Sequence, residues 1–223
     1  MEKYNLKAII FDFDGTILDT EMPEFLSWQE LYQEFALELP FDLWVNSIGT
    51  INGFDPLAHL EKQVGTVAPV RVRRVEQRHL ELIQAQPVQP GVQTWLAAAK
   101  AHPLSLAIAS SSQHAWVKDN LSRLGLLSHF PIIVGRDDAG HQPKPNPAVY
   151  QTALARLGIQ PNEAIAIEDS RNGVAAAKAA GLYTLYVPND LTKHNKDAAA
   201  DHTISSLAEF TLLDLFIQLG TVA

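Results

Sequence analysis

Beyond residue 91 the chain alternates short, uninterrupted apolar runs with longer segments of helical periodicity. The apolar runs cover 104–110, 131–134, 164–169 and 182–187, with a shorter one at 201–204. Helical patterns occupy the intervals, at about 91–101, 112–124, 147–157, 171–180 and 205–218. Apolar runs that lack polar alternation and are separated by helices are typical of parallel strands covered on both faces. The pattern therefore predicts an α/β fold with a doubly wound, Rossmann-like parallel sheet.

The segment from 20 to 87 contains no such run. It shows only helical patterns, over about 23–37, 41–47, 55–64 and 69–86. Pro and Gly in the stretch QPVQPG, residues 86–91, mark a turn at its far end. We predict an α/β core of residues 1–19 and 88–223 with an inserted α-helical cap of residues 20–87, which is a candidate lid.

A first apolar run near the N-terminus ends in acids. Residues 8–20 read AIIFDFDGTILDT, and no Lys or Arg accompanies Asp12, Asp14 and Asp19. Side chains two positions apart on an extended segment leave on the same side, so Asp12 and Asp14 would face one pocket. Asp14 followed by Gly15 is also a common turn pair, and the pair alone does not decide between the two interpretations. We expect Asp19 to order the linker that follows.

Polar residues also follow later apolar runs. Ser110 and Ser111 follow one run, Glu168 and Asp169 end another, and Lys144 stands between two prolines ahead of a helical pattern. Ligands of an open parallel sheet bind beyond the carboxyl ends of its strands, so we expect these residues to gather there with the first two acids.

Such a cluster of carboxylates needs a cation. At about 4 Å and an effective dielectric constant near 20, each pair of like charges costs on the order of 4 kcal/mol. Carboxylates, a main-chain carbonyl and water suit a hard ion, and Mg²⁺ is our first choice. Lys144 adds a positive charge, while Ser110 and the amides near Ser111 at a helix start are donors that suit a phosphate.

This set of groups indicates phosphoryl transfer. We interpret Asp12 as the nucleophile that attacks phosphorus to give an aspartyl phosphate. Asp14 would protonate the leaving oxygen and later take a proton from water.

The motif DFDGT, followed by Ser110, by KP at Lys144 and by ED at 168–169, resembles the haloacid dehalogenase superfamily. The resemblance is to the subgroup with a helical cap, which includes the beta-phosphoglucomutase-like and phosphoglycolate-phosphatase-like proteins. It implies that Asp12 is nucleophile and metal ligand, and that Asp14 is the acid/base and binds the metal through its carbonyl.

The same resemblance implies roles for the later motifs. Ser110 and Lys144 match the phosphate-binding positions, and Asp169 matches a metal ligand. Glu168 beside it would bind the metal directly or through water.

Two differences from the beta-phosphoglucomutases bear on whether the reaction is hydrolysis or phosphoryl transfer to a sugar. The mutase has a His where this chain has Glu24, and an Arg for a second phosphate in a cap loop that here reads SIGTINGF, residues 47–54. Because a mutase must hold both ends of a bisphosphate, we favour a Mg²⁺-dependent phosphatase acting on a small phosphorylated metabolite. A beta-phosphoglucomutase-like phosphomutase remains the alternative. Within the cap, Glu24, Thr50 and Asn52 are possible substrate contacts.

A phosphoacceptor switch is an alternative of another class. A response-regulator receiver also groups acids, a Ser or Thr and a Lys at strand ends. Receivers lack a helical insertion, and the second aspartate of DFDGT would speed hydrolysis where a switch should hold its phosphate.

The composition of the chain limits the kinds of partner that we expect the protein to bind. The 223 residues carry a formal net charge of −8, without the basic footprint that nucleic acid or an anionic membrane requires. Cysteine is absent, which excludes disulfides and thiolate metal sites. No stretch approaches the roughly 18 apolar residues that span a membrane, and no signal peptide is evident. We expect a cytoplasmic monomer.

Overall fold

A computed structural model describes residues 5–48, 53–194 and 199–220. Within them the core is a six-stranded parallel sheet in the order β3-β2-β1-β4-β5-β6. The strands are β1 (Ala8–Phe11), β2 (Ser105–Ala109), β3 (Ile132–Val134), β4 (Ala164–Glu168), β5 (Tyr183–Tyr186) and β6 (His202–Thr203). The doubly wound α/β prediction is confirmed, including the short run at 201–204.

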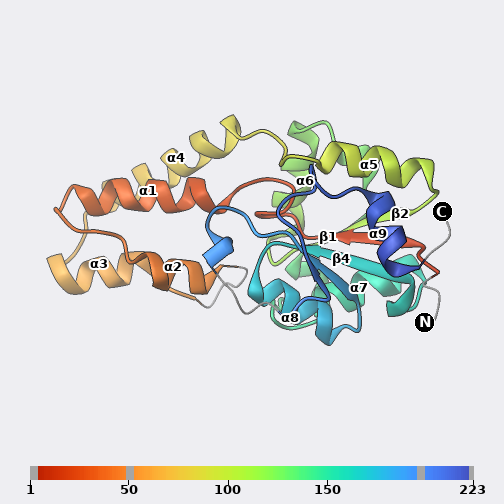
Figure 1. The fold of residues 1–223 in the computed structure, drawn as a ribbon. Helices are drawn as coiled ribbons and strands as arrows, with labels where there is room; N and C mark the ends of the chain where they lie inside the picture. Colours follow the sequence, from red (N-terminus) through yellow and green to blue (C-terminus); the bar gives the residue numbers. More distant parts are fainter. Residues whose placement is uncertain (1–4, 49–52, 195–198, 221–223) are drawn as a thin grey trace.

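Helices cover both faces of the sheet (Figure 1). They are α5 (Val92–Ala101), α6 (His114–Arg123), α7 (Ala148–Leu157), α8 (Arg171–Ala179) and α9 (Leu212–Leu219). Short 3-10 turns cover Leu127–His129, Arg136–Ala139, Pro161–Glu163 and Thr192–His194. Ile9 and Phe11 pack in the apolar cluster with α5, α6 and α9, while Ala8 and Ile10 pack in the cluster with α7 and α8. Both faces of β1 are therefore buried, which is why its sequence shows no polar alternation.

The last helix begins later than its pattern suggested, at Leu212 instead of 205. Thr211 Oγ1 accepts a hydrogen bond from the Asp214 amide, and Asp214 Oδ2 accepts one from the Thr211 amide. This reciprocal capping box satisfies the first free amides of the helix and sets its start.

In the described part of the chain, four helices lie between β1 and α5, and we call them the cap helices. They are α1 (Glu21–Gln33), α2 (Phe41–Ser47), α3 (Pro56–Val64) and α4 (Pro69–Ala85). They extend from one end of the core (Figure 1) and enclose an apolar cluster of their own, which includes Tyr32, Trp44 and Leu60. Leu18 and Val88 form an antiparallel bridge, so the segments that enter and leave the cap helices lie side by side.

None of the helices in the described part of the chain has both the length and the apolar content needed to cross a membrane.

Candidate active site

Neighbouring parallel strands bring the acidic motifs together. Phe11, the last residue of β1, is in register with Ile108 of β2 and Ile167 of β4. The next residue, Asp12, donates its amide hydrogen to the Ile167 carbonyl at 2.9 Å. The residues that follow these three strands therefore share one edge of the sheet, as the sequence predicted.

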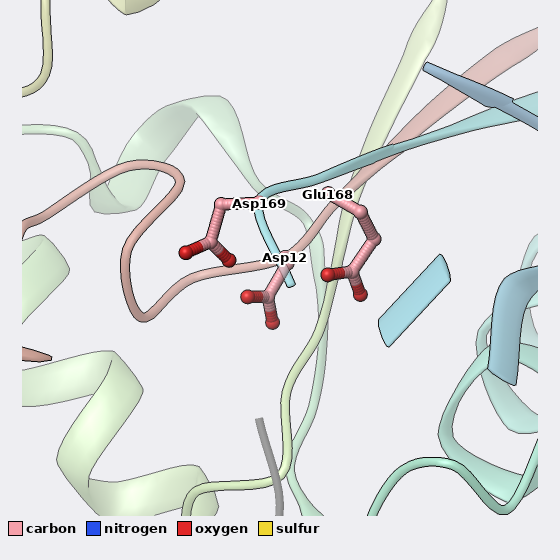
Figure 2. Close-up of side chains that lie close together, drawn as sticks. All are labelled: Asp12, Glu168 and Asp169. Atoms are coloured by element: carbon pink, nitrogen blue, oxygen red, sulfur yellow. The ribbon is translucent and has the colours of Figure 1, made fainter. Parts of the chain in front are cut away.

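Three carboxylates converge at this edge, from Asp12, Glu168 and Asp169 (Figure 2). One oxygen from each lies within 4.8 Å of the others, and the three residues are 6%, 0% and 0% exposed. Lys144 Nζ lies 2.5 Å from Asp12 Oδ1 and 2.6 Å from Glu168 Oε1. With all groups ionised, three negative charges face one positive charge. The donor set consists of carboxylate oxygens alone, so it fits a hard divalent cation.

Burial and neighbouring charges shift the pKa values of these groups. Burial raises the pKa of Asp12 to about 8, although Lys144 opposes the shift, and burial also raises the pKa of Asp169. For Lys144, burial lowers the pKa, but the adjacent carboxylates of Asp12 and Glu168 outweigh it and raise the pKa above its ordinary value. The ammonium group therefore stays protonated, while a divalent cation would favour ionised carboxylates.

At two glycines the backbone passes very close to the carboxylates of the cluster. Gly15 has φ +84°, and a Cβ there would lie 2.1 Å from Asp169 Oδ2. A Cβ on Gly173, in α8, would lie 1.8 Å from Glu168 Oε2. Both contacts are far too short for a real Cβ, so only glycine fits these backbones around the acids as they stand.

Sequence reasoning missed two partners of these carboxylates. Asn189 Nδ2 donates to Asp169 Oδ2 at 2.7 Å, and the Tyr150 hydroxyl donates to Glu168. Asn189 follows β5, so the strand-end argument would have found it if it had been extended to that strand. Tyr150 occupies an inward position of α7 and carries no signal that distinguishes it from a core aromatic residue.

Asp14 accepts hydrogen bonds from four side chains. Thr20 Oγ1 and Trp116 Nε1 donate to its Oδ1, both at 3.0 Å. Ser110 Oγ and Ser112 Oγ donate to its Oδ2, at 3.1 and 2.8 Å. Thr20 and Trp116 were not singled out from the sequence.

The serines after β2 divide between two environments. Ser110 is fully buried, and its Oγ accepts the amide hydrogen of Ser112 at 2.9 Å besides donating to Asp14. Ser111 and Ser112 line the adjoining cavity, and Ser111 Oγ also accepts the Lys144 amide hydrogen at 3.1 Å. The phosphate-binding roles of Ser110, Ser111 and Lys144 stay predictions.

A cavity of about 540 Å³ lies between the core acids and the cap helices. Asp12, Asp14 and Lys144 line its core side, and Glu24 lines it from α1. Burial, together with the charge of Asp14, raises the pKa of Glu24 to about 7. The other two cap predictions, Thr50 and Asn52, lie outside the described residues.

Comparison with known proteins gives consistent matches. The family model for haloacid dehalogenase-like hydrolases matches residues 9–187. YhcW of Bacillus subtilis, which is named as a phosphatase, is 40% identical over 220 residues, or 97% of this chain and 99% of its own. Beta-phosphoglucomutase of the same organism is 30% identical over 82% of this chain and 83% of its own.

A solved structure shows the same fold. CbbY of Rhodobacter sphaeroides, crystallised in complex with xylulose-(1,5)bisphosphate, matches with a TM-score of 0.75 and 29% identity. The match covers 94% of this chain and 99% of that one.

Proposed function

Because the chain belongs to the haloacid dehalogenase-like hydrolase family, we propose that it is a Mg²⁺-dependent phosphatase that hydrolyses a small phosphorylated sugar through an aspartyl-phosphate intermediate. One observation carries the proposal. Asp12 lines the cavity while its carboxylate lies beside Lys144 and within one buried cluster with Glu168 and Asp169. A nucleophile and a fixed positive charge therefore line one wall of the cavity, and the other two oxygen ligands belong to the same buried cluster as the nucleophile.

The first step is attack on phosphorus. Lys144 holds Asp12 Oδ1, and we assign the attack to Oδ2. The new bond joins this oxygen to phosphorus, and the bond from phosphorus to the sugar oxygen breaks. The sugar oxygen leaves with the bonding electron pair and takes a proton from Asp14.

The second step returns the enzyme to its starting state. Water attacks phosphorus and gives a proton to Asp14, the bond to Asp12 breaks, and inorganic phosphate leaves. Asp14 already accepts four hydrogen bonds, so it must exchange at least one of them for the leaving oxygen or for water. We propose that Thr20, Ser112 and Trp116 hold the acid near the reacting atoms.

Asp12, Asp169 and Glu168 would hold the Mg²⁺, the last of them directly or through water. When bound, the ion would offset negative charge on the carboxylates and on the transferring phosphoryl group. Lys144 contributes a charge of the same sign beside Asp12 and Glu168.

The substrate class is inferred from the relatives and the cavity. The relatives include a protein that is named as a phosphatase and a solved structure with a bound sugar bisphosphate. A volume of about 540 Å³ suits a small ligand. Transfer to water instead of a second sugar hydroxyl is favoured because the cap loop at residues 47–54, in which the mutase carries an Arg, contains none here.

A phosphatase screen tests the proposal. Purified protein with Mg²⁺ is given sugar phosphates, phosphoglycolate, nucleotides and an aryl phosphate, and both free phosphate and isomerised sugar phosphate are measured. Asp12→Asn should abolish release of phosphate, Asp14→Asn should reduce it nearly as much, and chelation should stop it reversibly. Asp19→Asn is the matched control, because Asp19 caps the start of α1 by accepting the Met22 amide hydrogen.

The outcomes separate the candidate functions. Isomerised product in place of free phosphate would assign the chain as a mutase. A stable phosphoprotein without turnover would indicate a switch. Turnover that survives Asp12→Asn would refute the proposed nucleophile.

A further inference from the structure

Three buried polar atoms in the described residues lack a hydrogen-bond partner, and all three belong to residues that line the active-site cavity. They are Trp44 Nε1, His79 Nε2 and Arg136 Nε. Trp44 is only 5% exposed. Native proteins pair nearly all buried polar atoms, so this concentration around one cavity indicates that the cavity takes a ligand with polar groups of its own.

Arg136 reaches the cavity from the core. It follows β3, and its amide donates to the Ser112 carbonyl at 2.9 Å. Gly135 permits this approach, since a Cβ there would lie 2.3 Å from the His114 amide nitrogen. Arg136 therefore lies beside Ser112, whose hydroxyl donates to Asp14, and both residues line the cavity.

The acids next to Arg136 in the sequence have other partners. Asp137 Oδ1 accepts the His114 amide hydrogen at 2.8 Å. Asp138 lies 2.7 Å from Arg156 and 2.8 Å from His114 Nδ1. Across residues 5–48, 53–194 and 199–220 the Arg136 guanidinium makes no ion pair of its own.

The other basic side chains that line the cavity are either paired with carboxylates or uncharged. Lys144 is held between Asp12 and Glu168. Burial lowers the pKa of His79, despite the Thr20 backbone and Asp14, so its ring is mainly neutral at pH 7. Arg136 is therefore the cavity cation whose charge no carboxylate of the described chain offsets.

Resting on the proposed phosphatase function, we propose that Arg136 is a specificity-determining residue that binds a second anionic group of the substrate. The substrate would then be a sugar bisphosphate or a phosphorylated sugar acid in preference to a sugar monophosphate without a second anionic group. A guanidinium binds phosphate and carboxylate through two parallel hydrogen bonds, which Gln cannot reproduce and Lys reproduces only in part. Burial raises the pKa of Glu24, on the cap side of the cavity, to about 7, so Glu24 repels such a group less at pH 7 than an ordinary carboxylate would.

The first test measures binding without turnover. In an Asp12→Asn background, isothermal titration calorimetry compares glucose 1,6-bisphosphate, 6-phosphogluconate and glucose 6-phosphate. We expect the protein to bind at least one of the first two about tenfold or more tighter than the third. Arg136→Gln should remove this preference, Arg136→Lys should retain part of it, and Arg73→Gln, at an exposed position of α4, should leave it unchanged.

The second test uses turnover by the otherwise unaltered enzyme. The ratio of kcat/KM for substrates with a second anionic group to kcat/KM for glucose 6-phosphate should fall about tenfold in Arg136→Gln, mainly through KM. Thermal melting of each variant confirms that it is folded, and Arg136→Lys provides the test if the Gln variant is not. An equal ratio in wild type and Arg136→Gln, or no preference in wild type, would overturn the inference. If no phosphate ester is hydrolysed at all, the proposed function fails, and the calorimetric comparison still decides the role of Arg136.

Discussion

We expect Gly173→Ala to destabilise the protein, although alanine is usually the more stable residue within a helix. Alanine normally stabilises a helix by up to about 1 kcal/mol relative to glycine. In α8 the added Cβ would lie 1.8 Å from Glu168 Oε2 and 2.1 Å from its Cδ, where ordinary contacts are 3.4–4 Å. Glu168 is fully buried, so its carboxylate must move by more than 1 Å within a packed interior.

The magnitude follows from what Glu168 holds. Displacement of the carboxylate strains or breaks the charged hydrogen bond that Lys144 donates to it, which contributes about 1.5–3 kcal/mol to stability. It also leaves the buried Tyr150 hydroxyl without its acceptor, which costs about 1–3 kcal/mol. After subtraction of the helix gain, we expect Gly173→Ala to lower the free energy of unfolding by about 1.5–5 kcal/mol. For a chain of this length that corresponds to a Tm lower by roughly 3–20 °C.

Differential scanning calorimetry measures this loss. Ala175→Gly is the matched control, because Ala175 is exposed on the same helix and its replacement reports helix propensity alone, about 1 kcal/mol of destabilisation. Glu168→Asp shortens the side chain by one methylene group and so withdraws the carboxylate from the added Cβ. The double variant should therefore lose less free energy of unfolding than the sum of the losses in the two single variants. A Gly173→Ala protein as stable as wild type would refute the steric argument.

Three further predictions concern the cap and the metal. Since the raised pKa of Glu24 means that the folded state binds its proton more tightly than the unfolded state, stability should fall as pH rises from 4.5 to 7. Glu24→Gln should flatten this slope and stabilise the protein at pH 8 by about 1–2 kcal/mol, and an unchanged Tm profile between pH 5 and 8 would contradict the shift. Asn172→Ala removes a 2.7 Å hydrogen bond from α8 to the Ile48 carbonyl beside the cap helices, so we expect KM to rise several-fold with kcat nearly unchanged, and a loss confined to kcat would disprove this link. Mg²⁺ at 100 times its Kd should stabilise wild type by about 2.7 kcal/mol, and Asp169→Asn should lose most of this gain; equal gains would exclude Asp169 as a ligand.

Much of the fold followed from the sequence because burial on both faces leaves a clear mark. The uninterrupted apolar runs at 104–110 and 164–169 are stable only as strands covered by helices on both sides, and both are strands of the sheet. Parallel strands share one edge for their carboxyl ends, so Asp12 and Asp169 could be brought together without knowledge of any contact. The start of α9 was misplaced, since the capping box at Thr211 is a local signal that the broader apolar pattern obscured.

The directions of the side chains in the site depended on tertiary structure. Ser110 follows β2 as the sequence indicated, but its hydroxyl donates to Asp14 from across the neighbouring strand end. Arg136 was one basic residue among 17, and its sequence neighbours Asp137 and Asp138 look like its natural partners. Only the packing of the turn after β3 against α6 and α7 shows that both acids are bound elsewhere. Sequence periodicity reports which face of an element is buried, whereas hydrogen-bond partners on different elements are decided by how those elements pack.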